Sequence, residues 1–185
     1  MLVTMTGQLT IGDAALGDAA QIAGIYAHYV LESTATFESD PPDDAEIARR
    51  LGELTAAGYP YLVTRDDTGR IVAFGFAQRY GPRIGYRYSV ETTIYVHPDS
   101  VGRGIGSRLL QALLTECETR GFRQAFAVIA ASEPASVILH ARAGFLPVGT
   151  LAGAGWKHGQ WIDVFLMQRK LGEGSDTLPE QKNCA

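Results

Sequence analysis

Residues 90–114 read VETTIYVHPDSVGRGIGSRLLQALL, and this stretch decides the fold. β-Branched and aromatic residues over 93–96 favour a strand, and the segment 97–100 ends it. From Gly104 onward apolar residues recur at helical spacing, at Ile105, Leu109, Leu110, Leu113 and Leu114. The stretch therefore predicts a strand, a glycine-rich loop and a helix.

The glycine-rich loop is a candidate phosphate site, because backbone N–H groups at a helix N-terminus attract anions. Two well-known phosphate loops are excluded: no Lys-Ser or Lys-Thr follows Gly106, and Leu109 stands where the last glycine of the dinucleotide fingerprint belongs. An ordinary strand-to-helix turn, in which glycines only supply positive φ, is the alternative. Glu91, a few residues upstream, is a candidate base beside a phosphate-bearing cofactor.

The segment HPDSVGRGIGSRLL, residues 97–110, resembles motif A of the GNAT superfamily of N-acetyltransferases, [Gln/Arg]-x-x-Gly-x-[Gly/Ala]. In that family the loop amides hold the pyrophosphate of acetyl-CoA. The resemblance implies a cofactor-binding loop of Val101, Gly102, Arg103, Gly104, Ile105, Gly106 and Ser107. Val101 stands at the Gln/Arg position, which removes a polar side chain but leaves the backbone donors. We therefore expect a working acetyl-CoA site of reduced affinity.

Three further segments narrow the resemblance to one group, the phosphinothricin and methionine sulfoximine N-acetyltransferases. They are HYVLESTATFESDPP (28–42), RIGYRYSVETTIYV (83–96) and GWKHGQWIDVFLMQ (155–168). The similarity implies an α/β (α+β) GNAT fold over residues 9–171, with a mixed, mostly antiparallel sheet flanked by helices. The fourth strand is expected to splay from the fifth at a bulge. Residues 1–8 are then an N-terminal extension and 172–185 a polar, disordered tail.

Helical and strand patterns fill the rest of the chain. Strands are expected at 9–11, 61–65, 71–78, 89–96, 124–129, 146–151 and 161–168, and helices at 17–31, 43–57, 104–120 and 136–143. Asp18 offers a carboxylate to cap the first helix.

Length and composition suit a single domain, since 185 residues with 46% hydrophobic content can bury a core. A net charge of −4 without a basic patch disfavours a nucleic-acid partner. No apolar run is long enough to span a membrane and the start lacks signal-peptide features, so a cytoplasmic protein without a membrane partner is expected. Cys117 and Cys184 indicate neither a disulfide framework nor a metal site.

Acetyl transfer to an amine requires a group that accepts the ammonium proton. The resemblance implies that Glu91 is this base, and burial between aromatic residues such as Tyr86 and Tyr88 would raise its pKa. A solvated glutamate on a strand is the alternative. His140 occupies a position where many family members carry a Tyr general acid, although a lone helical His is often structural.

The resemblance also assigns cofactor contacts outside motif A. Backbone N–H groups of Ile94, Tyr95 and Val96 would meet the acetyl carbonyl and the pantetheine arm, where fixed donors stabilise developing charge. Glu133 stands where an Asn usually contacts CoA, and Ser136 follows in the same region.

Substrate contacts are expected from two regions. Arg79, Arg83 and Arg87 cluster near Glu91, and a guanidinium pairs well with a carboxylate or phosphinate. A solvated basic loop is the alternative. The remaining candidates from the resemblance are Phe37, Tyr86, Lys157, His158 and Trp161.

These observations predict an acetyl-CoA-dependent N-acetyltransferase, a homodimer, that acts on the α-amine of a small glutamate-like amino acid. Transfer is expected to be direct, because Cys117 lies in a helix without an activating neighbour. Another small amine, such as a polyamine, is one alternative, but a polyamine would favour acidic residues in place of Arg83 and Arg87. A non-catalytic acyl-CoA-binding sensor is the other, favoured by Val101 and Glu133.

Overall fold

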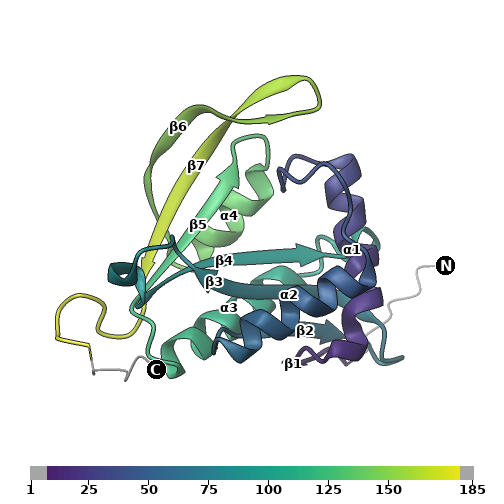
Figure 1. The fold of residues 1–185 in the computed structure, drawn as a ribbon, viewed down its shortest axis with the longest axis horizontal. Helices are drawn as coiled ribbons and strands as arrows, with labels where there is room; N and C mark the ends of the chain where they lie inside the picture. Colours follow the sequence, from purple (N-terminus) through teal and green to yellow (C-terminus); the bar gives the residue numbers. More distant parts are fainter. Residues whose placement is uncertain (1–7, 180–185) are drawn as a thin grey trace.

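A computed structural model describes residues 8–179, which form one seven-stranded sheet with helices on both faces (Figure 1). The strand order is β1-β2-β3-β4-β5-β7-β6, and every neighbouring pair is antiparallel except β4 and β5. The strands are β1 Thr10–Asp13, β2 Tyr61–Arg65, β3 Ile71–Arg79, β4 Ser89–Val96, β5 Gln124–Ala130, β6 Leu146–Lys157 and β7 Gln160–Lys170. The helices are α1 Ala19–Glu32, α2 Asp44–Ala56, α3 Ile105–Thr119 and α4 Pro134–Arg142. The predicted mixed, mostly antiparallel sheet is confirmed.

The sheet opens between β4 and β5. These strands pair only from Ser89–Gln124 to Glu91–Phe126 and then diverge, whereas β5 stays paired with β7 over its whole length (Figure 1). The predicted splay is thus confirmed, but the bulge predicted in β4 is not found in its pairing with β3 or β5. The register between β3 and β4 runs unbroken from Arg79–Val90 to Ala73–Val96. The splay arises because β5 stays paired with β7 and turns away from β4.

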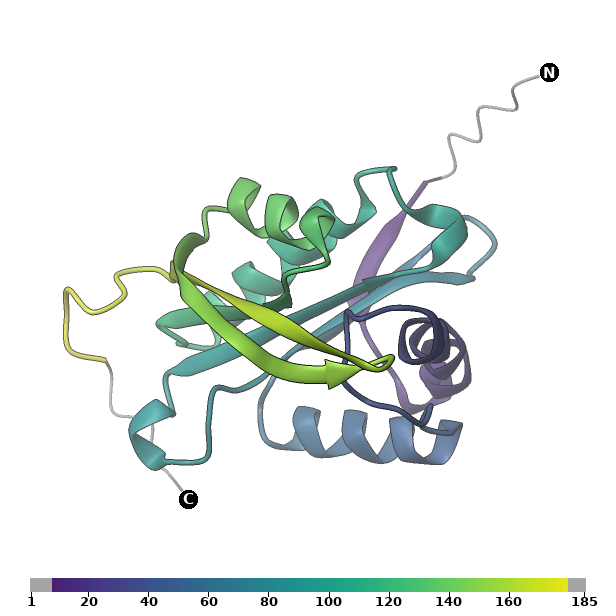
Figure 2. The same cartoon turned by 90° about the horizontal axis from the view of Figure 1, so that it is seen from above.

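The helices pack their apolar faces against the two sides of the sheet. Helices α1 and α2 lie on one side, and α3 and α4 lie on the other (Figure 2). The predicted apolar positions of α3, Ile105, Leu109, Leu110, Leu113 and Leu114, are all buried. Burying one such side chain contributes about 1.5–3 kcal/mol, so α3 fixes the loop that precedes it. Among the described residues, no helix is both long and apolar enough to cross a membrane.

Asp18 does not cap α1, contrary to the prediction. Residues Leu16–Asp18 form a 3-10 turn before the helix, and the Asp18 carboxylate accepts the Ala15 N–H at 2.7 Å. It also pairs with Arg65 of β2 at 2.6 Å. The carboxylate thus ties the start of α1 to the sheet, which a local capping rule does not foresee.

The chain after β7 is held by side-chain contacts. Residues 172–177 are held by a Lys170–Asp176 ion pair and by Arg123, which donates to the Thr177 hydroxyl at 2.5 Å. The structure thus describes turns and bends over 172–177, and the domain bounds expected from the sequence stay a prediction. Cys184 and most of the predicted N-terminal extension lie outside the described residues.

Candidate active site

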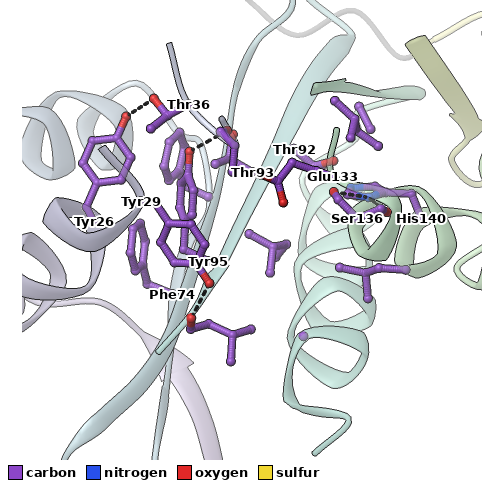
Figure 3. Close-up of a pocket in the computed structure, with 18 of the residues that line it drawn as sticks. Tyr26, Tyr29, Thr36, Phe74, Thr92, Thr93, Tyr95, Glu133, Ser136 and His140 are labelled. Atoms are coloured by element: carbon purple, nitrogen blue, oxygen red, sulfur yellow. Dashed lines mark hydrogen bonds between the residues drawn. The ribbon is translucent and has the colours of Figure 1, made fainter. Parts of the chain in front are cut away.

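A cavity of about 840 Å³ occupies the splay and continues onto the face of the sheet that α1 and α2 cover. Figure 3 shows its two sides, with Glu133, Ser136 and His140 on one and Tyr26, Thr36 and Tyr95 on the other. Both halves of the splayed sheet therefore contribute residues to one cavity.

The glycine-rich loop lies at one end of this cavity. Gly102 and Gly104 have φ of 76° and 74°, in the left-handed region, and Gly104 is the residue that precedes α3. A Cβ at either glycine would meet nothing within 4 Å, so backbone conformation and not packing requires them. Arg108 N–H, which donates to the Gly104 carbonyl at 3.2 Å, begins the helical ladder. The preceding N–H groups at the positive helix end are therefore available to an anion.

The predicted cofactor loop lines the cavity through Val101, Gly102, Gly104, Ile105, Gly106 and Ser107, but Arg103 is not part of the lining. Val101 is 58% exposed. Its side chain makes no polar interaction there, as expected from its departure from the motif.

The backbone of β4 borders the same cavity. His97 N–H donates to the Val72 carbonyl of the neighbouring chain segment at 2.8 Å. Because ladder bonds alternate along an antiparallel pair, the Tyr95 amide faces β3, and the amides of Ile94 and Val96 face the open side. Two of the three predicted backbone donors are thus directed into the splay.

Glu91 is half-buried on β4, lines the cavity and lies opposite Gln78 of β3. Burial raises the pKa of its carboxyl group, and a hydrogen bond with Gln78 lowers it by less. The expected aromatic neighbours, Tyr86 and Tyr88, do not line the cavity. Glu91 shares its face of β4 with Thr93 and Tyr95, since side chains alternate along a strand.

His140 is buried, 3% exposed, on the α4 side of the cavity. Its Nδ1 lies 2.8 Å from the Ser136 carbonyl oxygen, which can only accept, so Nδ1 carries the proton. Nε2 is enclosed and has no hydrogen-bond partner among the described residues. Burial lowers the pKa of the ring and so favours its neutral form, which, with the proton on Nδ1, has a lone pair at Nε2.

Glu133 and Ser136 both line the cavity at the start of α4. The Thr34 hydroxyl donates to the Glu133 carboxylate at 3.1 Å. The carboxylate is therefore held toward the segment after α1.

The predicted arginine cluster does not line the cavity. Arg79 neighbours Gln78 on β3, and alternation places its side chain on the opposite face of the sheet. Arg83, Tyr86 and Arg87 lie in the connection between β3 and β4, outside the lining. The Arg87 guanidinium stacks over the Tyr88 ring at 4.8 Å.

Of the other substrate candidates, one lines the cavity, one is buried outside its lining and two are exposed on the β6–β7 hairpin. Phe37 lines the cavity. Lys157 is buried and is not itself part of the lining, but its ammonium donates to the main-chain carbonyls of two lining residues, Tyr29 and Thr36. His158 forms the β6–β7 turn with φ 49°, and Trp161 is 69% exposed and packs edge-to-face with Trp156.

The side of the cavity under α1 and α2 is lined by side chains that, apart from Tyr95, were not among the candidates from the sequence. Its aromatic floor is formed by Tyr26, Tyr61, Phe74, Phe76 and Tyr95, and its rim carries Glu38 and Arg50. Arg50 pairs with Glu38 at 2.7 Å. The spacing of Phe74, Phe76 and Gln78 along β3 is the pattern that could have revealed this face. No group of three side chains suited to a metal ion occurs among the described residues.

Comparison with known proteins agrees with this geometry. A model of the acetyltransferase (GNAT) family matches residues 22–145, more than half of the chain. The phosphinothricin N-acetyltransferase of Alcaligenes faecalis is 44% identical over 164 residues, covering 88% of this chain and 83% of that protein. An L-methionine sulfoximine/L-methionine sulfone acetyltransferase of Pseudomonas aeruginosa is 34% identical over 162 residues, covering 88% and 94%.

Among solved structures, the phosphinothricin acetyltransferase of Sinorhizobium meliloti in complex with acetyl-CoA superposes with a TM-score of 0.91. It is 42% identical, and the match covers 96% of this chain and 95% of that one. The chain therefore belongs to the GNAT family of N-acetyltransferases. Within the family it falls in the phosphinothricin and methionine sulfoximine acetyltransferase subfamily, which confirms the resemblance found in the sequence.

Proposed function

We propose that the protein transfers an acetyl group from acetyl-CoA to the α-amine of a small glutamate-like amino acid of the phosphinothricin or methionine sulfoximine type. The observation that carries this proposal is that one cavity joins the glycine loop of α3 to Glu91. The substrate class comes from its relatives, a phosphinothricin N-acetyltransferase and an L-methionine sulfoximine/L-methionine sulfone acetyltransferase.

The residues present fit acetyl-CoA. The N–H groups that begin α3 suit its pyrophosphate, and the open space at Gly102 and Gly104 admits close approach. When bound, acetyl-CoA supplies the activated acetyl group. In this proposal the open-side amides of Ile94 and Val96 donate to the acetyl carbonyl oxygen, where negative charge develops during attack.

Glu91 is the proposed general base. Burial raises the pKa of its carboxyl group, which makes the carboxylate a stronger base, and its place on the cavity face of β4 lets it accept the amine proton directly or through one water. Direct attack by the freed amine is proposed, because burial raises the pKa of the Cys117 thiol to about 12 and leaves it unreactive.

For His140 we propose a packing role in place of the acid role considered from the sequence. The proton on its ring is committed to the Ser136 carbonyl, and Nε2 has none to give. The CoA thiolate is a good leaving group, so its departure does not require this acid.

We also propose that the protein is a homodimer. The edge strand β6 and its neighbour β7 expose large apolar side chains, namely Leu146, Val148, Leu151, Trp156 and Trp161. Such a patch is characteristic of a protein interface. A cytoplasmic location, where acetyl-CoA is available, completes the proposal.

A substrate panel tests the proposed activity. CoA release is measured with phosphinothricin, methionine sulfoximine, methionine sulfone, unmodified amino acids and spermidine, and values of kcat/KM are compared. We expect the first three to exceed spermidine by about 100-fold or more, since a polyamine lacks the groups this class recognises. Equal and feeble rates across the panel would contradict the proposal.

A further inference from the structure

One short segment crosses the opening between the two halves of the splayed sheet. We call residues 33–38, which follow α1, the strap. Five of its residues, Thr34, Ala35, Thr36, Phe37 and Glu38, line the cavity. In Figure 1 this connection lies between α1 and the outer end of the β6–β7 hairpin.

On one side of the splay, β4, α1 and α2 hold the strap through hydroxyl and ion-pair contacts. The Tyr95 hydroxyl of β4 donates to the Ala35 carbonyl at 3.3 Å. The Tyr26 hydroxyl of α1 donates to Glu38 at 3.0 Å, and Glu38 pairs with Arg50 of α2. These contacts lie on the side of the cavity that holds the aromatic floor.

On the other side of the splay, Lys157 at the end of β6 and Glu133 just before α4 hold the strap. The Lys157 ammonium, at the end of β6, donates to the Thr36 carbonyl at 2.7 Å and to the Tyr29 carbonyl at 3.3 Å. Glu133 accepts from the Thr34 hydroxyl, as described above, and Ser132 shares a 2.6 Å hydrogen bond with that hydroxyl. The strap is thus bound to elements on both sides of the splay.

Close packing between Phe37 and β6 adds to the contacts that Lys157 and Glu133 make with the strap. The Phe37 ring lies against Gly155 of β6, where an added Cβ would come within 2.2 Å of it. No other residue type fits at Gly155 without moving the ring.

The groups around the buried Lys157 ammonium show what its charge interacts with. The residue is only 6% exposed, and taking an ammonium out of water is costly unless its donors are satisfied. Its hydrogen bonds go to carbonyls 121 and 128 residues away in sequence, not to its own hairpin. The negative charges of Glu133 and Glu38 act on it favourably from the surrounding walls.

We propose that Lys157 and Glu133 are positioning residues that hold the strap across the cavity and so shape the acceptor side of the site. This inference rests on the proposed acetyl transfer, and it replaces the direct substrate and CoA contacts expected of these two residues. The strap borders the side of the cavity under α1 and α2, which is the acceptor side in this proposal, and the hydrogen bonds of Lys157 go to Tyr29 and Thr36 and not to the glycine loop. Loss of the anchor should therefore affect the amine far more than acetyl-CoA.

The test compares Lys157→Met, Lys157→Arg and Glu133→Gln with Lys170→Met as the matched control, since Lys170 forms an ion pair with Asp176 away from the cavity. Hydrogen–deuterium exchange of the peptide containing residues 33–38 reports on the strap without any turnover. Steady-state kinetics gives KM for the best amine of the panel and for acetyl-CoA.

For Lys157→Met we expect about tenfold faster exchange in the strap and a KM for the amine about tenfold higher, with kcat and the KM for acetyl-CoA within about threefold. Lys157→Arg should restore part of the amine affinity, because it keeps a cation and donors. Glu133→Gln keeps an acceptor for Thr34 and should shift the amine KM by about threefold. Lys170→Met should match the wild type.

The inference would be overturned by wild-type exchange and amine KM in Lys157→Met, or by an equal rise of the KM values for the amine and for acetyl-CoA. Faster exchange without a change in amine KM would also overturn the positioning role. If Lys157→Met does not fold, Glu133→Gln and Lys157→Arg decide by the same two readouts. A wild-type protein that acetylates no amine of the panel would refute the proposed function, and the exchange data would still decide whether Lys157 holds the strap.

Discussion

At the scale of single residues, Glu91 makes the sharpest prediction. Glu91→Gln cannot accept a proton, so kcat/KM at neutral pH should fall by about 100-fold or more. The loss should shrink at high pH, because the amine then deprotonates in solution. A pH–rate profile from pH 5 to 10 for both proteins measures this, and a profile of Glu91→Gln parallel to that of the wild type would remove Glu91 as the base.

Protein stability gives an independent readout of the same residue. The folded-state pKa of Glu91 is raised, so the folded state binds its proton more tightly than the unfolded chain. This group therefore destabilises the fold progressively as pH rises through the unfolded and then the folded pKa. Glu91→Gln removes that penalty, and its melting temperature relative to the wild type should increase from acid to neutral pH. His140→Phe, by contrast, should keep the wild-type pH–rate profile.

At the scale of elements, the turn into α3 depends on a backbone conformation. Gly104→Ala places a Cβ at φ 74°, which costs about 1–2 kcal/mol and disturbs the amides at the helix start. We expect the KM for acetyl-CoA to rise about tenfold. Gly24→Ala is the matched control: Gly24 is exposed within α1, so this change should stabilise the protein by about 0.5–1 kcal/mol and leave the KM unchanged. Denaturant titration and acetyl-CoA kinetics measure both, and an unaltered KM in Gly104→Ala would refute the loop assignment.

At the scale of the whole molecule, the exposed apolar side of the β6–β7 hairpin predicts self-association. Light scattering after gel filtration should give twice the chain mass of 19.9 kDa. The double substitution Leu146→Glu and Val148→Glu should yield monomers, because it buries charges in the proposed interface. Leu178→Glu, at a residue 93% exposed after β7, should remain a dimer. A wild-type monomer at micromolar concentration would refute the homodimer.

From the sequence, the helices and strands of this protein could be predicted, and the glycine loop could be recognised before α3. Helix and strand periodicity and the positive φ of a glycine turn are local properties, so the bounds of β4 matched the prediction and those of α3 differed by one residue at each end. The tertiary structure was needed to show which polar groups pair between distant segments and which face of a strand a side chain takes: Asp18 binds Arg65, and Arg79 faces away from the cavity. It likewise directed Lys157 and Glu133 to the strap. Such roles depend on partners about 50 to 120 residues away in the chain or on which face of a strand is covered, and neither is encoded in a local pattern.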